Sequence, residues 1–132
     1  MPQDGLITLS SRYPARDTMD RLLAALGKRN MTVFARIDHA AGAASAGIEL
    51  RPTEVVIFGN AKGGTVLMQD QQTAGIDLPL KALVWEDADG KVWLSYNDPA
   101  WIAQRHGLGA ASAGAVEAMV KALAAIAAEV TA

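Results

Sequence analysis

Apolar residues recur along the chain at two different spacings, and the spacing changes several times between predicted strands and predicted helices. Alternation of period two, or short runs rich in β-branched and aromatic residues, predicts five strands. Repeats at positions i, i+3, i+4 and i+7 predict two long amphipathic helices. The strands are expected at Leu6–Ser10, Thr32–Asp38, Glu54–Phe58, Leu80–Glu86 and Val92–Tyr96, and the long helices at Ala15–Arg29 and Val116–Val130.

Local signals sharpen two parts of this pattern. The residues from Val55 to Phe58 are apolar in succession, so this strand is expected inside the sheet with both of its faces covered. Asp89 and Gly90 separate the last two strands, and this dipeptide is a strong signal for a tight turn between antiparallel strands. The last two strands are therefore predicted to form a hairpin.

Capping residues predict three shorter helices. Asp38 and Gly47 enclose an alanine-rich segment as an N-cap and a stop. The pair Asp98-Pro99 begins a helix that is expected to end at Gly107, because proline suits the first helical position. A third helix is expected over Thr65–Gln72.

These elements predict an α+β fold, with one mostly antiparallel sheet of about five strands and two long helices on one face. The 132 residues are enough for one core, so residues 1–132 are expected to form a single domain. Twelve basic against fourteen acidic residues give a net charge of −2, without the basic excess that nucleic-acid binding needs. No nucleic-acid partner is expected.

The absence of cysteine excludes disulfides, zinc–thiolate sites and cysteine nucleophiles. No apolar run approaches the ~18 residues of a membrane span, so no membrane association is expected. The first fifteen residues lack the basic stretch followed by an apolar one that marks a secretory leader. A soluble cytoplasmic protein is therefore predicted. The alternative of a leader peptide that has already been removed stays open.

Several short motifs occur in a fixed order and together resemble one protein family. They are Arg36-Ile37-Asp38-His39-Ala40, Leu50-Arg51-Pro52-Thr53-Glu54, Phe58-Gly59-Asn60, Gly64-Thr65, Leu67-Met68, Asp77-Leu78-Pro79-Leu80 and Tyr96-Asn97-Asp98-Pro99. From about Leu6 to Leu108 the chain closely resembles the bacterial and archaeal family known as domain of unknown function DUF302. The family usually has proline at the positions of Ala61 and Val66, so the loop before the third helix is expected to be less rigid here.

The resemblance implies a small domain of the TATA-binding-protein-like class, built from a strand, a helix, four strands and a helix. It also implies a protein that is often a dimer and that has no settled biochemical activity. The family has no established catalytic residues, so none can be carried over to this chain. Candidate sites therefore have to come from the residues themselves.

The first candidate site is the loop Gly59–Thr65, between a predicted strand and a predicted helix. Its backbone N–H groups, the helix dipole and the charge of Lys62 could hold an anion. The spacing differs from that of a P-loop, because Thr-Val follows the last glycine where Lys-Ser/Thr is required. The alternative is a turn and helix cap that uses Asn60 and Thr65.

A second candidate site groups Arg36, Asp38 and His39, at the end of the second strand, with Asp77 before the fourth. Histidine titrates near neutral pH and a carboxylate could fix its tautomer, which is the minimum for general acid–base catalysis. The alternative is structural, with Asp38 capping the short helix and His39 packing at the edge of the core. No obvious nucleophile accompanies these residues.

His39 and His106 are the only histidines, and together with Met68 they could be metal or haem ligands. The two histidines lie 67 residues apart and form no His-x-x-x-His motif, so no metal site is expected and the cofactor is left unknown. His106 is instead expected to complement, with Arg105, the C-terminal end of its short helix.

Both faces of the sheet are predicted to carry apolar side chains, because several strands have them at odd and at even positions. Two long helices cover only one face, and the other would expose a patch at least as large as the largest on a typical monomer. A homodimer over this second face is therefore expected. The alternative is a monomer in which Trp85 and Trp93 point under the helices. The second strand should place Val33, Ala35 and Ile37 on one face and Phe34 and Arg36 on the other, and the main aromatic side chains to be covered are Phe34, Trp85 and Trp93.

The pattern as a whole predicts a homodimeric protein that binds a small molecule or an anion. The alternative is a small acid–base enzyme that uses His39 with Asp38 or Asp77. The residues expected to converge on the binding pocket are Arg36, Asp38, His39, Asn60, Lys62, Thr65 and Asp77.

Overall fold

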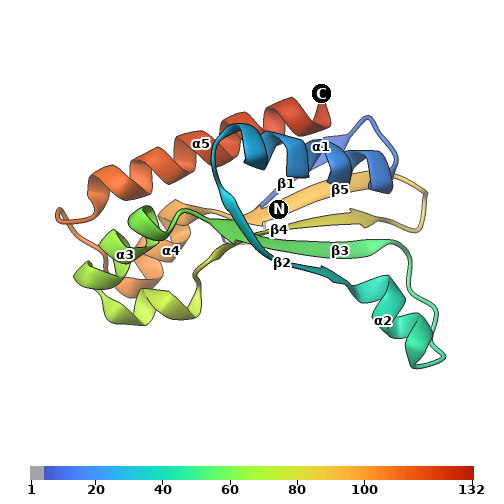
Figure 1. The fold of residues 1–132 in the computed structure, drawn as a ribbon, viewed down its shortest axis with the longest axis horizontal. Helices are drawn as coiled ribbons and strands as arrows, with labels where there is room; N and C mark the ends of the chain where they lie inside the picture. The colour runs from blue at the N-terminus through green and yellow to red at the C-terminus, as the bar shows by residue number, and fades with distance from the viewer. Residues whose placement is uncertain (1–4) are drawn as a thin grey trace.

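The computed structural model describes residues 5–132 of the chain. A five-stranded antiparallel sheet with strand order β1-β5-β4-β3-β2 carries helices α1 and α5 on one face (Figure 1). The strands are β1 (Leu6–Ser11), β2 (Thr32–Asp38), β3 (Thr53–Gly59), β4 (Leu80–Glu86) and β5 (Val92–Asn97). The helices are α1 (Ala15–Lys28), α2 (His39–Ser45), α3 (Ala61–Asp70), α4 (Pro99–His106) and α5 (Ala113–Thr131), with the 3-10 helix η1 (Gln72–Ile76) after α3.

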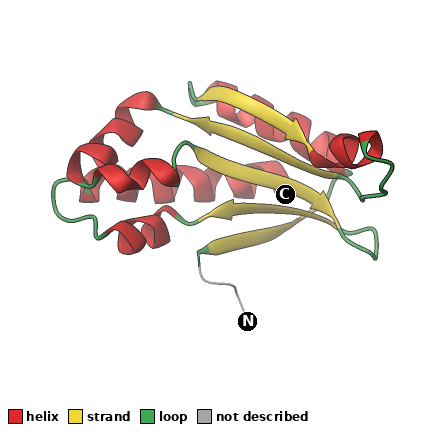
Figure 2. Cartoon of the chain, turned by 90° about the horizontal axis from the view of Figure 1, so that it is seen from below, coloured by secondary structure: helices red, strands yellow, loops and turns green. Residues whose placement is uncertain are grey.

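The α+β fold class predicted from the sequence is confirmed. The first strand pairs with the last, so β1 and β2 form the two edges of the sheet. Seen from below, the strands lie in front of α1 and α5, which shows that both long helices cover the same face (Figure 2). Helices α3 and α4 gather with η1 at one end of the sheet, and α2 extends from the other end (Figure 1).

The hydrophobic core fills the space between the sheet and the two long helices. The apolar stripe of α1 is buried there, as its spacing predicts. Every second residue of the central strands points to the same side, because side chains alternate along a strand. The core residues include Met19, Leu22 and Leu26 of α1, Val56, Phe58, Val84 and Leu94 of the sheet, and Leu123, Ile126 and Val130 of α5.

Several helix ends confirm the capping predictions. Asp38 Oδ1 accepts a hydrogen bond from the N–H of Ala41 at 2.9 Å, at the start of α2. Asp98 Oδ1 accepts one from the N–H of Ala100 at 3.0 Å, at the start of α4. Gly107 ends α4 in the left-handed conformation, with φ of 63°. These signals act within a few residues, which is why they could be recognised without the fold.

Helix α3 begins four residues earlier than predicted, at Ala61 instead of Thr65. The reason is that Asn60 caps the helix and allows the glycine-containing turn to become helical. Helix α3 ends at Asp70, and η1 follows as a separate element. Ala61 and Val66, which were expected to loosen a loop, therefore lie inside a helix.

A β-bulge in β2 changes the predicted distribution of its side chains. Val33 pairs with Phe58 and Ala35 pairs with Ile57, so Phe34 is an extra residue between them. Directly paired residues share a face of the sheet, so Val33 lies on the side covered by the helices and Ala35 on the opposite side. The strict alternation predicted for this strand is therefore wrong, because one extra residue reverses the side-chain direction.

No helix among residues 5–132 packs across the sheet face opposite α1 and α5 (Figure 2). We call this surface the open face. The prediction that the third strand is covered on both faces is therefore wrong for the single chain, because Val55 and Ile57 point away from the core. The apolar side chains of the open face are Leu6, Ile37, Val55, Ile57, Leu83, Trp85 and Trp93.

The predicted hairpin between β4 and β5 is confirmed, and Gly90 supplies the positive φ of its turn, 79°. Asp87 holds the turn together. Its Oδ1 accepts hydrogen bonds from the N–H groups of Asp89 and Lys91, both at 2.9 Å, and its Oδ2 accepts one from Trp93 Nε1 at 2.8 Å. The bond from Trp93, together with those from the backbone, lowers the pKa of the Asp87 carboxyl.

Asp87 is expected to contribute to the loss of stability at acid pH. Because its pKa is lower in the folded than in the unfolded chain, its contribution is present above the unfolded value of about 3.9 and is lost as the pH falls through the folded value. The Asp87→Asn variant should therefore be less stable than wild type at pH 7 and lose less on acidification. Urea unfolding followed by circular dichroism at pH 7, 5 and 3 measures this, with Asp89→Asn of the same turn as control. An unchanged pH profile in Asp87→Asn would contradict the prediction.

Candidate functional site

The segment Gly59–Thr65 forms the junction of β3 and α3. Asn60 Oδ1 accepts a hydrogen bond from the N–H of Lys62 at 2.9 Å, so Asn60 caps α3. Thr65 lies further along the helix and takes no part in the cap. The interpretation of this loop as a helix cap is therefore confirmed for Asn60 and wrong for Thr65.

A pocket of about 220 Å³ lies beside this junction, and we call it the α3 pocket. Its wall is mostly apolar. It is built from three parts of the chain that are far apart in the sequence: β2, the segment from β3 to β4, and α5. The side chains that matter below are Phe34, Asn60, Thr65, Met68, Leu78 and Met119.

Two glycines of α3 shape this pocket. A β-carbon at Gly63 would lie 3.1 Å from Met119 Cε, so this glycine lets α3 approach α5 closely. A β-carbon at Gly64 would lie 3.9 Å from Leu78 Cδ1 and 4.0 Å from Met68 Cε. Gly64 itself lines the pocket, so a larger side chain at this position would fill part of it.

Arg36 and Asp38 border a different hollow, beside the start of α1. Arg36 forms an ion pair with Glu54, and its Nη2 donates to Glu54 Oε1 at 3.2 Å. The hydrogen bond to Glu54 raises the pKa of the Arg36 guanidinium. Asp38 is occupied by the cap of α2. Both side chains thus have structural partners in the folded chain.

His39 lies on the open face, where it borders a hollow with Lys81 and Trp85. It is exposed and does not pack at the edge of the core as one interpretation expected. Asp38 pairs with a residue on the helix-covered side, and adjacent residues of an extended strand point to opposite faces. The acid–base pair expected between His39 and Asp38 is therefore wrong. The pair expected between His39 and Asp77 is also wrong, because Asp77 binds Arg105 and His106.

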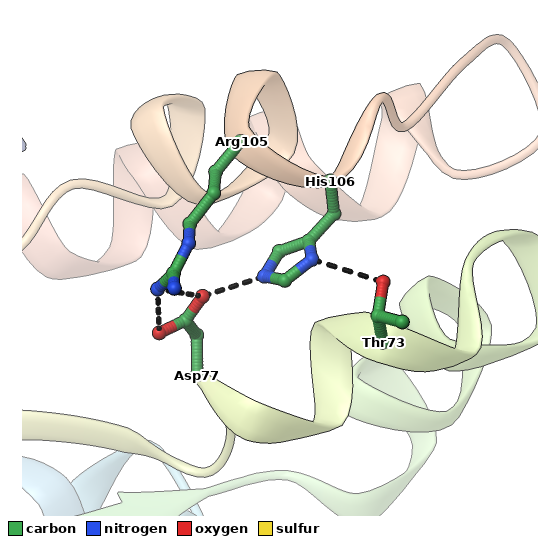
Figure 3. Close-up of polar contacts among 4 residues, drawn as sticks. All are labelled: Thr73, Asp77, Arg105 and His106. Atoms are coloured by element: carbon green, nitrogen blue, oxygen red, sulfur yellow. Dashed lines mark hydrogen bonds and ion pairs between the residues drawn. The ribbon is translucent and has the colours of Figure 1, made fainter.

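Asp77 instead lies at the centre of a polar cluster that joins η1 to the end of α4 (Figure 3). His106 Nε2 donates to Asp77 Oδ2 at 2.6 Å, and Arg105 Nη1 donates to both carboxylate oxygens at 3.0 Å. On the other side of the ring, His106 Nδ1 lies 3.1 Å from the hydroxyl oxygen of Thr73. We call these four residues the Asp77 cluster.

The expected convergence of the predicted site residues in one pocket is not found. Asn60 and Thr65 share the α3 pocket, and the side chain of Lys62 is exposed on the first turn of α3. The other predicted residues, Arg36, Asp38, His39 and Asp77, lie in the three separate places described above.

Asp70 ties the end of α3 to the segment before α5. Its Oδ2 accepts hydrogen bonds from the hydroxyl of Ser112 at 2.7 Å and from the N–H of Gly109 at 2.9 Å. These bonds, that from Ser112 first, lower the pKa of the Asp70 carboxyl. Asp70 and the Asp77 cluster thus anchor α3 and η1 to the C-terminal part of the chain.

Several residues of these sites are not predicted as site residues by the sequence pattern. Phe34 and Met119 both line the α3 pocket although they lie 85 positions apart, and no local pattern connects them. Thr73 and Asp77 are four residues apart, a spacing that could have suggested a pair. Nothing local indicated that α4 would place His106 in contact with both.

The three side chains considered as metal or haem ligands lie in three different places: Met68 at the α3 pocket, His39 on the open face and His106 in the Asp77 cluster. Within residues 5–132, no three His, Cys, Asp or Glu side chains are close enough together to hold a metal ion. In the part of the chain that the structure describes, no helix combines the length and the apolar character needed to cross a membrane.

The fold and these sites define a small α+β domain whose antiparallel sheet is backed by two long helices. The family model of the domain of unknown function DUF302 matches residues 7–126. The chain belongs to this family. The resemblance noted from the motifs is confirmed, and the match continues beyond Leu108 into α5.

A solved structure supports the same fold. The crystal structure of an uncharacterized conserved DUF302 protein from Bacillus stearothermophilus is similar with a TM-score of 0.85, over 96% of this chain and 98% of that chain. The sequences are 16% identical, so the similarity shows a common fold.

Two similar proteins carry a functional name. Both are called fluoride-specific ion channel FluC 1, from Brucella suis biovar 1 (strain 1330) and Brucella abortus biovar 1 (strain 9-941), and each is 56% identical to this chain over 116 residues. The match covers 88% of this chain but 46% and 43% of those proteins. The chain thus spans less than half the length of these relatives.

Proposed function

We propose that this domain binds a small molecule with an apolar body and a negatively charged end in the α3 pocket. The observation that carries the proposal is the composition of the pocket, where a mostly apolar wall meets the capped N-terminus of a helix. The wall would hold the apolar body, and Asn60 and Thr65 would orient the polar end. This combination is typical of small-molecule sites.

The size and the softness of the wall support a small ligand. Met68 and Met119 have unbranched thioether side chains, which adapt to ligands of different shape. An engineered protein cavity of about 150 Å³ is large enough to bind benzene. The α3 pocket, at about 220 Å³, therefore suits a single ring or a short alkyl chain.

The first turn of α3 favours a negative charge at the other end of the ligand. The aligned peptide dipoles give a helix N-terminus a partial positive charge, and its first N–H groups have no acceptor inside the helix. Asn60 accepts from one of them, that of Lys62, and the exposed side chain of Lys62 adds a full positive charge to the same turn. A carboxylate is therefore the proposed charged group.

The FluC relatives give a reason to include a small inorganic anion among the probes. Their name describes a channel for fluoride, and this chain matches less than half of each of them. Their channel activity is therefore not extended to this domain. Fluoride serves as a comparison for the carboxylate in the test.

Octanoate is expected to bind the purified protein with a Kd on the order of 0.1–1 mM, measured by isothermal titration calorimetry. Octanol has the same alkyl chain without the charge and should bind several-fold more weakly, and sodium fluoride should give no comparable heat. Equal affinity for octanoate and octanol would contradict the role given to the first turn of α3.

The Gly64→Leu variant should lose most of the octanoate binding, because the new side chain occupies the pocket. Gly27→Leu is the matched control, since Gly27 is a helical glycine of α1 and an added β-carbon there meets nothing within 4 Å. Octanoate binding that survives in Gly64→Leu would place the ligand elsewhere and overturn the proposal.

We also propose that the domain forms a homodimer through the open face. Trp85 and Trp93 stack on this face with their ring centroids 6.0 Å apart, and Ile37, on the edge strand β2 of the same face, is 44% exposed. Phe34, expected here from the sequence, lies instead at the α3 pocket, so the support comes from the two tryptophans and their apolar neighbours. A second copy presenting the same face would cover these side chains by two-fold symmetry.

A further inference from the structure

The Asp77 cluster has a geometry that neither the α3 pocket nor the dimer requires. The ring of His106 stands between the Thr73 hydroxyl, 3.1 Å from Nδ1, and the Asp77 carboxylate, 2.6 Å from Nε2 (Figure 3). A hydroxyl within hydrogen-bond reach of a base, with the base oriented by a third group, is the general signature of an activated nucleophile.

Asp77 determines which nitrogen of His106 can accept a proton. A carboxylate has no hydrogen to donate, so it accepts the Nε2–H of the ring. In the neutral ring, Nδ1 is then left with its lone pair and accepts a hydrogen bond from the Thr73 hydroxyl. This is the tautomer that a general base for the Thr73 hydroxyl needs.

The base and the nucleophile differ in burial. The side chains of His106 and Asp77 are only 7% and 14% exposed, so water competes little for their hydrogen bond. Thr73, by contrast, is exposed at the start of η1. A reagent in solution can therefore reach the hydroxyl while the base behind it stays shielded.

We propose that Thr73, His106 and Asp77 form an acyl-transfer site in which Thr73 Oγ1 attacks the carbonyl carbon of an activated ester. As the new C–O bond forms, the hydroxyl proton passes to His106 Nδ1, and Asp77 stabilises the imidazolium through Nε2–H. The bond to the leaving oxygen then breaks, and His106 returns the proton to that oxygen. Water attacks the acyl group with His106 again as base, which releases the carboxylic acid and restores the Thr73 hydroxyl.

A fluorophosphonate tests the nucleophile directly, because the P–O bond to Thr73 forms as fluoride leaves and no second step is needed. The purified protein is expected to gain one phosphonyl group, which peptide mass spectrometry maps to Thr73. Thr73→Ser should keep this labelling. Thr73→Val abolishes it, and His106→Gln should slow it by at least about 100-fold. Thr32→Val, at an exposed threonine of β2, is the matched control and should label like wild type.

Hydrolysis of 4-nitrophenyl acetate by the same variants should follow the same order. Absence of the label from Thr73, or an equal labelling rate in a folded His106→Gln protein, would overturn the proposal. Thr73→Val leaves the pair of His106 and Asp77 in place, so it remains informative if the histidine variant fails to fold. Thr73→Val should still bind octanoate while it loses the label, which separates this proposal from ligand binding in the α3 pocket.

Discussion

The Phe58→Ala variant is expected to lose about 3–5 kcal/mol of unfolding free energy, because it removes a fully buried aromatic side chain and leaves a cavity. Phe58 has no exposed surface and lies in β3 between Val33 and Leu80 of the neighbouring strands. Domains of this size are stable by only about 5–15 kcal/mol, so a large part of the total would disappear. Urea unfolding followed by circular dichroism measures the loss.

The chain offers a matched control for this substitution, since its only other phenylalanine is Phe34. Phe34 is 52% exposed in the bulge of β2, so truncating it should cost less than about 1.5 kcal/mol. Similar losses in the two variants would mean that the core does not lie between the sheet and the long helices. The Phe34→Ala protein also serves the binding test, because the ring lines the α3 pocket.

The second large effect concerns the mass of the particle in solution. Light scattering at micromolar concentration is expected to give twice the chain mass of 13.8 kDa for wild type. Ile37→Glu places a charge on the open face, within the proposed interface, and should give a single chain. The physical reason is that an unpaired carboxylate buried against a second apolar face carries a large desolvation cost.

The same change at Ile76 is the control. Ile76 is 73% exposed in η1, away from the open face, so Ile76→Glu should leave the mass at two chains. A wild-type mass near 13.8 kDa that does not change on concentrating the sample would remove the dimer. In that case Trp85 and Trp93 would remain at the surface of a monomer, stacked on each other.

The two proposed sites share one structural feature, the anchoring of η1 and its neighbours by polar side chains. Asp77 is followed directly by Leu78, which lines the α3 pocket, and it is held by Arg105 and His106 of α4. Loss of the carboxylate would therefore disturb both the acyl-transfer geometry and one wall of the pocket. For this reason Thr73, rather than Asp77, is the residue whose substitution separates the two functions.

The sequence pattern predicts correctly that Asp77 pairs with a histidine, but it predicts His39 where the structure has His106. His39 and His106 are both compatible with a carboxylate partner by residue type alone. His39 follows β2 and points to the open face, whereas His106 ends α4 directly above η1. Which histidine meets Asp77 depends on where α4 packs, and that is a property of the whole fold.

The order of the elements and many of their ends follow from local sequence signals. Asp38 caps α2, and Asp98 and Gly107 delimit α4, as predicted. The hydrogen bonds at such ends join residues at most five positions apart, so the local sequence is sufficient to specify them. The burial of the α1 stripe follows in the same way from the helical period.

Which side chains form the candidate sites depends on how the elements pack against one another. The bulge at Phe34 arises from the register between β2 and β3, and the α3 pocket exists because α5 brings Met119 to the end of the sheet. The contact of His106 with Thr73 likewise requires α4 to pack against η1. These contacts join residues more than twenty positions apart, and they are set by strand order and helix packing, which no local spacing of apolar residues encodes.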